Sequence, residues 1–198
     1  MSETTLQTWQ TTLRPVGALD GWAGRFAELP DSVSLLAEPF HAMVDARTTD
    51  PAALEGLVGA PLPGPNAWRG GERVTAIWLG PDEWLLTSPF CTPAELEAAA
   101  REAGAAAVPE ARLAVVDVSA QRTTLRLRGA HARDVLETGC AIDLHPRSFG
   151  AGSAAVTLLG QAGVVLLGLG PSDYRIVVRS SFAAYLAEWL LDAATEWR

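Results

Sequence analysis

Two short segments of the chain share one pattern, and this repetition constrains the fold more than any other feature. L-G-P-D-E-W-L-L at 79–86 matches L-G-P-S-D-Y-R-I at 169–176, and a helical pattern follows each segment. Upstream, the order strand, arginine, helix and glycine at 47–59 recurs at 128–139. A short turn motif can match by chance, so the shared order of elements carries the argument. We predict an internal duplication of an α+β unit whose halves pack as one pseudo-symmetric domain.

The predicted elements follow this order in both halves. We expect strands at about 40–47, 73–79, 84–87, 111–119, 123–128, 155–159, 164–169 and 174–179, and helices at 50–59, 92–104, 130–139 and after 181. This pattern indicates an α+β fold with two pseudo-repeated halves of mixed or antiparallel sheet plus helices. Residues 1–32 are expected to form an irregular N-terminal arm. Residues 33–198 then form a single domain whose halves span about 33–110 and 111–198.

Two of the predicted helices carry clear signals. The helix at 92–104 has Thr92 as N-cap, Pro93 at its first position, Glu95 to close a capping box and Gly104 to end it. In the last helix, five apolar residues recur at helical spacing and predict one buried stripe: Phe182, Tyr185, Leu186, Trp189 and Leu190.

The charge composition excludes several kinds of function. All fifteen basic residues are arginine, so the chain has neither a Schiff-base lysine nor a phosphate-loop lysine. The net charge is −8 and no basic stripe is present, which argues against nucleic acid as a partner.

The cysteines and the hydropathy pattern indicate in which cellular compartment the protein is found. Cys91 and Cys140 have no spacing typical of a metal ribbon or redox motif, and two cysteines suit a reducing compartment. The first residues show no basic and apolar signal pattern, and the apolar runs are too short to span a membrane. We expect a soluble, cytoplasmic protein with no membrane partner.

The sharpest local cluster is C-A-I-D-L-H-P-R-S-F at 140–149, where Cys140, Asp143 and His145 lie within six positions. These residues could form a nucleophile with its base or part of a metal site. The duplication favours another interpretation, because G-C-A-I in the second half aligns with G-A-P-L at 59–62 and sets Cys140 opposite an alanine. We interpret Cys140 as a packing residue just after a helix. The rest of the segment is predicted to be an exposed loop in which His145, Arg147 and Phe149 could contact a partner.

The other motifs do not add a catalytic site. Asp117 and Ser119 could place an acid at a strand end, but a turn in which they satisfy the backbone is the favoured interpretation. G-L-G-P at 168–171 precedes a strand rather than a helix, so it does not form a dinucleotide fingerprint. A nucleophile elbow is also missing. We therefore predict no catalytic, cofactor-binding or metal-ligating residue in this chain.

Several segments together resemble a known family. D-V-S followed by a strand and A-H-A-R-D-V-L-E-T-G-C-A-I-D-L is similar to the start of aminomethyltransferase-like, folate-binding domains. Within that superfamily, four segments resemble the gamma subunit of heterotetrameric sarcosine oxidase: P-L-P-G-P-N at 61–66, W-L-G-P-D-E-W-L-L at 78–86, D-L-H-P-R-S-F at 143–149 and S-F-A-A-Y-L-A-E-W-L-L-D-A at 181–193. The resemblance covers roughly residues 33–195, and the combination of segments is what makes it specific.

The resemblance implies an aminomethyltransferase-like fold of two related halves and a place in a larger complex. In such a complex the partners are the alpha, beta and delta subunits; the larger subunits hold FAD, FMN, NAD and the tetrahydrofolate site, and the smallest subunit binds zinc. The complex demethylates sarcosine to glycine, produces hydrogen peroxide and passes the one-carbon unit to tetrahydrofolate. The gamma subunit would be a structural, non-catalytic member that binds no cofactor and is inactive when isolated.

One departure from the superfamily limits what can be carried over. Aminomethyltransferases have an acidic pair after a Gly-rich turn, whereas the matching stretch here, Q-A-G-V-V-L-L-G-L at 161–169, has no carboxylate. No folate-binding or catalytic residue is therefore assigned. Two alternatives stay open: a standalone folate-dependent aminomethyltransferase-like protein, and the matching subunit of an N-methyl amino-acid dehydrogenase complex.

Overall fold

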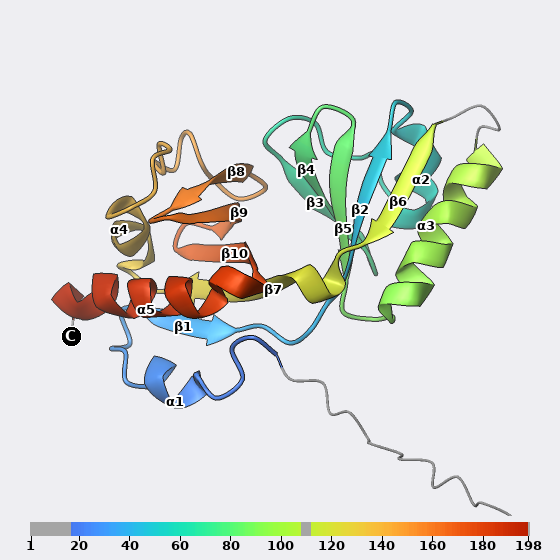
Figure 1. The fold of residues 1–198 in the computed structure, drawn as a ribbon. Coiled ribbons are helices and arrows are strands. Elements are labelled where there is room, and N and C mark those ends of the chain that lie inside the picture. Colours follow the sequence, from blue (N-terminus) through green and yellow to red (C-terminus); the bar gives the residue numbers. More distant parts are fainter. Residues whose placement is uncertain (1–16, 108–111, 198) are drawn as a thin grey trace, which may run out of the picture.

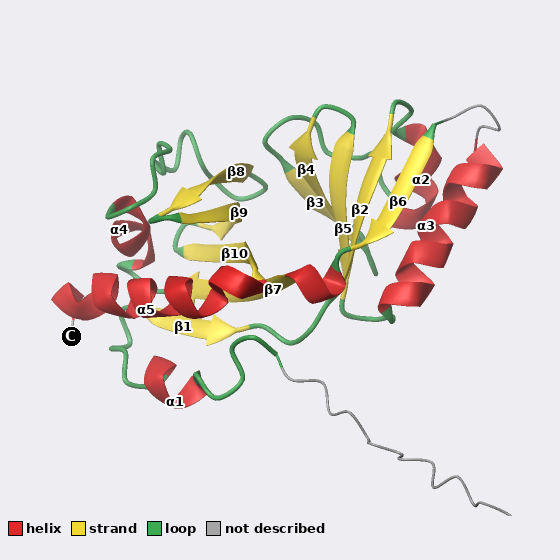
Figure 2. Ribbon diagram, viewed as in Figure 1, coloured by secondary structure: helices red, strands yellow, loops and turns green. Residues whose placement is uncertain are grey.

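The computed structural model describes residues 17–107 and 112–197, which form two antiparallel five-stranded sheets with helices on their outer faces (Figures 1 and 2). The helices are α1 (Ala23–Phe26), α2 (Ala52–Val58), α3 (Pro93–Ala107), α4 (Ala132–Glu137) and α5 (Ala183–Ala193). The strands are β1 (Ser34–Ala37), β2 (Ala42–Thr48), β3 (Trp68–Gly70), β4 (Thr75–Gly80), β5 (Glu83–Ser88), β6 (Leu113–Asp117), β7 (Arg122–Arg128), β8 (Ala154–Leu159), β9 (Ala162–Gly170) and β10 (Asp173–Arg179). Short 3-10 helices cover Ser119–Gln121, Ser180–Phe182 and Ala194–Trp197. This confirms the α+β class.

The internal duplication is visible in the order of the elements. Strand, strand, helix, three strands and helix run from β1 to α3, and the same series runs from β6 to α5. The two sheets also have matching strand orders, β3-β4-β5-β2-β6 and β8-β9-β10-β7-β1. We refer to these as sheet B and sheet A, respectively.

Each half donates its first strand to the sheet of the other half. β1 pairs with β7 in sheet A, and β6 pairs with β2 in sheet B. The chain therefore crosses between the sheets twice, at residues 38–41 and at residues 118–121, which we call the first and second crossover (Figure 1). The sequence pattern does not predict this exchange, and the division into halves near residue 110 stays a prediction.

The hydrophobic core has three parts. One lies between sheet A and the helices α4 and α5, and a second lies between sheet B and the helices α2 and α3. The third joins the two sheets face to face, with Met43, Ile77 and Leu85 from sheet B against Val165, Leu167 and Val177 from sheet A. Since a buried aliphatic side chain contributes about 1.5–3 kcal/mol, this third part holds the two sheets together.

The predicted capping box of α3 is present, but the predicted helix end is wrong. The Thr92 amide donates to Oε2 of Glu95 (2.8 Å), and the Glu95 amide donates to Oγ1 of Thr92 (3.3 Å). These hydrogen bonds hold the pKa of Glu95 below its ordinary value. The helix runs past Gly104 to Ala107. Gly104 instead packs closely on Leu113: a Cβ at this position would lie 2.0 Å from Cδ2 of Leu113, so that side chain would have to shift.

Thr92→Ala is expected to lower the free energy of unfolding by about 1 kcal/mol, because it removes an N-cap. Urea denaturation at pH 7 would measure this, with the exposed Thr49→Ala as the matched control.

The stability that this cap contributes should depend on pH. The folded-state pKa of Glu95 lies below 4.5, so the contribution of this carboxylate is complete above about pH 4.5 and is lost as the pH falls through the folded-state pKa. The cost of Thr92→Ala should therefore shrink in acid, and an equal cost at pH 3 and pH 7 would contradict this account.

Two terminal segments differ in detail from the expectation. Residues 1–16 of the expected arm lie outside the described residues, and the following segment contains α1, with Leu19 and Phe26 buried against the core of sheet A. In α5 the predicted stripe is only partly right, because Phe182 and Tyr185 are 41% and 39% exposed. The residues that the helix buries are Ala183, Leu186, Ala187, Leu190 and Leu191.

Candidate functional site

A cavity of about 570 Å³ lies where the two crossovers meet. The first crossover lines it with Glu38 and His41, and the second lines it with Ser119. Thr124 of β7 and the segment 17–20 complete the wall. Because the strand exchange brings both crossovers to this place, the cavity is a direct product of the internal duplication. It is the main candidate site of the chain.

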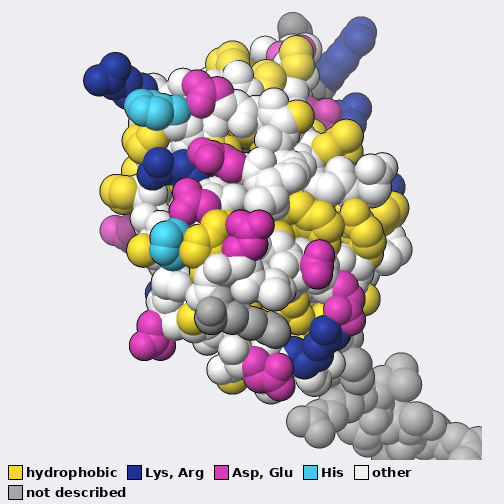
Figure 3. Space-filling view, turned by 90° about the vertical axis from the view of Figure 1, so that its left-hand side faces the viewer, with side chains coloured by type: hydrophobic (Ala, Val, Ile, Leu, Met, Phe, Trp, Pro, Cys, Tyr) yellow, Lys and Arg dark blue, Asp and Glu magenta, His cyan; other side chains and the backbone are white. Residues whose placement is uncertain are grey.

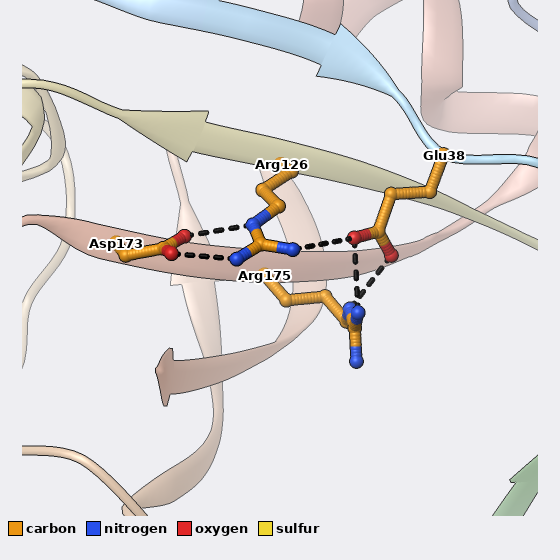
Figure 4. Close-up of polar contacts among 4 residues, drawn as sticks. All are labelled: Glu38, Arg126, Asp173 and Arg175. Carbon is orange, nitrogen blue, oxygen red and sulfur yellow. Dashed lines mark hydrogen bonds and ion pairs between the residues drawn. The ribbon is translucent and has the colours of Figure 1, made fainter. Parts of the chain in front are cut away.

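The first crossover begins with a buried carboxylate that two arginines neutralise (Figure 4). The Glu38 side chain is 7% exposed, and its Oε2 lies 2.6 Å from Nε of Arg175. Arg175 Nη2 also donates to Oε1 of Glu38 (3.0 Å). Arg126 Nη1 lies 3.7 Å from the same Oε1, while the guanidinium of Arg126 donates two hydrogen bonds to Asp173, at 2.8 and 2.6 Å. A carboxylate held in this way is not available as a general base.

His41 is the titratable ring in this cavity. Its burial lowers its pKa below the ordinary value of 6.5, and nearby Arg175 lowers it further, although Glu38 opposes both effects. The imidazole is therefore neutral at pH 7. No hydrogen bond links the His41 side chain to another group among the described residues. A neutral ring without a hydrogen-bonded nucleophile or acid does not form a catalytic constellation.

Asp117 and Ser119 serve the backbone of the second crossover, as the favoured interpretation predicted. Ser119 is buried, and its hydroxyl donates to Oδ1 of Asp117 (2.6 Å) and accepts the amide of Met43 (2.8 Å). The Ser119 amide donates to the same Oδ1 (2.9 Å). These bonds hold the 3-10 turn that leads from β6 into β7, and they engage Oδ1 of Asp117 in that turn.

One residue of the cavity wall also has a polar atom that the described residues leave without a partner. Thr124 is 3% exposed, and its Oγ1 has no hydrogen-bond partner within residues 17–107 and 112–197. The sequence could not single out this hydroxyl, because it lies in an alternating strand where any outward residue is a candidate. Sequence reasoning also missed Glu38, Arg175 and Asp173, because only the strand register brings these residues together.

The contacts of the loop that contains Cys140 hold the loop in shape and pack it on the core. Cys140 is partly buried against the core of sheet A, and Ala60 takes the equivalent place against the core of sheet B. Asp143 accepts the amide of His145 (2.9 Å) and the hydroxyl of Ser148 (2.5 Å). These bonds lower the pKa of Asp143. The carboxylate therefore shapes the loop.

The three residues proposed for subunit contact lie on different sides of this loop. His145 and Arg147 are exposed, whereas Phe149 is 6% exposed and stacks on Tyr174, with ring centroids 6.5 Å apart. Phe149 therefore anchors the loop in the core and presents little side-chain surface. A contact of this loop with another subunit stays a prediction.

Neither a metal-ligating cluster nor a membrane-crossing helix is found in the described part of the chain. Within residues 17–107 and 112–197, no group of three or more His, Cys, Asp or Glu side chains could hold a metal ion. None of the helices in this part of the chain is long and apolar enough to cross a membrane. On the face shown in Figure 3, acidic side chains are scattered among small hydrophobic areas, and the basic side chains are isolated.

Comparison with known proteins identifies close relatives. Residues 46–196 match the model of the sarcosine oxidase, gamma subunit family. The chain is 36% identical to sarcosine oxidase subunit gamma of Corynebacterium sp. (strain U-96) over 152 residues, which cover 76% of this chain and 71% of that protein. It is 37% identical to the corresponding subunit of Arthrobacter sp. over 148 residues, which cover 74% and 70%.

Solved structures agree with the sequence comparison. A chain of heterotetrameric sarcosine oxidase from Corynebacterium sp. U-96, in complex with pyrrole 2-carboxylate, superposes with a TM-score of 0.81 and 31% identity, covering 92% of this chain and 96% of that chain. The glycine cleavage system aminomethyltransferase T from Bartonella henselae gives a TM-score of 0.61 at 15% identity, covering 89% and 49%. The second similarity is one of fold.

Proposed function

Because the chain belongs to the gamma subunit family of sarcosine oxidase, we propose that it is the gamma subunit of a heterotetrameric sarcosine oxidase and has a structural, non-catalytic role. The assembled complex would oxidise sarcosine to glycine, with formation of hydrogen peroxide and 5,10-methylenetetrahydrofolate. The proposal keeps the cytoplasmic location expected from the sequence.

One structural observation supports the non-catalytic role: the acidic groups at both candidate positions are already engaged within the chain. Glu38 is neutralised by Arg175, and Asp143 is held by the loop it closes. A carboxylate that is bound to groups of its own chain is less available to a substrate as a general acid or base. These contacts therefore support an architectural role for Glu38 and Asp143.

The partners would be the alpha, beta and delta subunits, and they would hold the cofactors. We place FAD, FMN, NAD and tetrahydrofolate on the larger subunits and zinc on the delta subunit. The residues of this chain do not fit a folate site, because β9 and its preceding turn present Q-A-G-V-V-L-L-G-L without a carboxylate. No reaction step is therefore assigned to a side chain of this subunit.

Co-expression of the chain with the alpha, beta and delta subunits tests the proposal. The chain should co-purify in a yellow complex that releases hydrogen peroxide when sarcosine is supplied, and the isolated chain should be colourless and inactive. Tight binding of tetrahydrofolate, or methylene transfer, by the isolated chain would refute the non-catalytic role. Turnover with an artificial electron acceptor but without peroxide would instead indicate a dehydrogenase complex.

The double substitution His145→Ala and Arg147→Ala is expected to weaken assembly of the complex by about tenfold, through the loss of two interface side chains. Both residues are exposed, so the melting temperature of the isolated chain should stay the same. Analytical ultracentrifugation of the mixed subunits would measure the affinity. Arg112→Ala, an exposed arginine just before β6, is the matched control. Wild-type affinity in the double variant would exclude this loop as a contact.

A further inference from the structure

The outer edge of β8 is open in its middle and closed at both ends. At one end the Ala154 amide donates to the carbonyl of Asn66 (2.8 Å), and at the other end the Gly160 amide donates to the carbonyl of Gly139 (3.0 Å). Hydrogen-bonding groups of alternate residues point to the same side of a strand. The amides of Val156 and Leu158 therefore also point away from β9. Beyond the ladder with β9, no backbone hydrogen bond of Val156 is found among the described residues.

The other sheet edges in the described part of the chain are protected. On β6, Nη2 of Arg101 donates to the carbonyl of Val115 (2.6 Å). On β1, the segment containing α1 lies alongside the strand (Figure 1). β3 is three residues long and carries the exposed Arg69. Natural sheets protect their edges in these ways because an open edge pairs with other chains. Between its two closed ends, at residues 156–158, β8 has none of these protections among the described residues.

The exposed apolar side chains of β8 favour binding of another polypeptide at the open edge. Val156 and Leu158 are 59% and 56% exposed. Their side chains lie on the same face of β8 as that of Ala154. At Ala154 this face is buried against sheet B. From residue 148 to residue 172 the sequence contains no ionisable side chain. Soluble proteins usually place a charge, often lysine, on such an edge. The charge-free edge therefore suits an uncharged segment as its occupant.

We propose that the edge of β8 between Ala154 and Leu158 receives an extended, uncharged segment of a partner subunit, which joins sheet A as a sixth strand. The inference rests on the proposed function, because it assumes that the chain is assembled with larger subunits. A second copy of this chain is a poorer occupant. The closed ends leave only the edge from 154 to 158, and a stable dimer needs roughly 800 Å² per partner. A segment of a subunit that binds elsewhere as well needs far less area here.

Hydrogen–deuterium exchange of the isolated chain and of the whole complex tests the proposal directly. The amides of Val156 and Leu158 should exchange rapidly in the isolated chain. Assembly should slow their exchange by at least about tenfold, because both N–H groups then donate to the added strand. The amide of Thr157, which faces β9, is the internal reference and should be protected in both states.

Three substitutions separate the backbone from the side chains. Val156→Pro removes the outward N–H and keeps an apolar side chain, which an edge strand tolerates, and should weaken assembly by about fivefold, the loss of one hydrogen bond. Val156→Lys should weaken it by at least about tenfold, because it places a charge in the contact. Val116→Lys on β6 is the matched control, since Val116 is 56% exposed on a strand whose edge is already blocked. It should leave assembly unchanged.

The outcomes distinguish this inference from the proposed function. A complex that forms while the amides of Val156 and Leu158 exchange as fast as in the isolated chain overturns the sixth strand and leaves the proposed function intact. Protection that appears in the isolated chain as its concentration rises assigns the edge to a second copy and also overturns it. If the chain forms no complex with larger subunits, both proposals are wrong. The exchange data on the wild type decide the matter even if a variant folds poorly.

Discussion

Replacing Glu38 with glutamine is expected to lower the free energy of unfolding by about 3 kcal/mol. The substitution preserves the side-chain volume but removes the negative charge that lies 2.6 Å from Nε of Arg175. Arg126 keeps Asp173 as its partner, whereas Arg175 has no second carboxylate within 4 Å among the described residues. The loss should fall near the low end of the range for a broken buried pair, because the Arg175 side chain is still 21% exposed. Urea denaturation at pH 7 would measure it.

Two further variants make this test specific. Glu72→Gln, at an exposed position, makes the same chemical change and should alter the stability by less than about 0.5 kcal/mol. Combining Glu38→Gln with Arg175→Met should recover more than half of the loss, because no uncompensated charge is then left buried. A single variant as stable as the wild type would show that water already screens this ion pair.

Phe149→Ala is expected to lower the free energy of unfolding by about 3 kcal/mol or more, as for other buried aromatic residues. Phe149 is 6% exposed and belongs to the core of sheet A, where it stacks on Tyr174. The truncation leaves a cavity beneath the loop 143–149 and removes its anchor. Thermal and urea unfolding of the isolated chain would measure the loss without any partner subunit.

Phe90→Ala is the matched control, because Phe90 is 61% exposed and the same truncation should cost less than about 0.5 kcal/mol there. Phe149→Leu should keep most of the stability, since it fills much of the cavity. If Phe149→Ala leaves the isolated chain as stable as the wild type but weakens assembly, this residue is a direct subunit contact.

The elements set by local sequence were predictable. Gly59 ends α2 in a left-handed conformation (φ 77°), as its position after the helix predicted. The G-P-D-E and G-P-S-D turns join β4 to β5 and β9 to β10. Each of these features depends on a few consecutive residues. The family resemblance that the sequence suggested is confirmed by the match over residues 46–196.

The features that depend on long-range pairing were not predictable in the same way. β1 is four residues long and gave no strand signal, and its partner β7 lies far away in the sequence. The cluster of Glu38, Arg126, Asp173 and Arg175 needs that pairing before any two members meet. Alternation along β7 places Arg126 on the face opposite Leu125 and Leu127, but alternation alone does not identify the carboxylate that lies on that face. The candidate cavity was missed because both crossovers had to be placed first.

The exchange of first strands has a consequence for how the chain folds during synthesis. β1 leaves the ribosome early, but its partner β7 appears only after every strand of sheet B, including β6, has been made. Sheet B in turn stays incomplete until β6 arrives from the second half. Such non-local contacts slow folding and leave apolar strands exposed to wrong partners in the meantime. Nascent chains should therefore depend on chaperones until residue 128 has emerged, and neither half should be a stable protein when made alone.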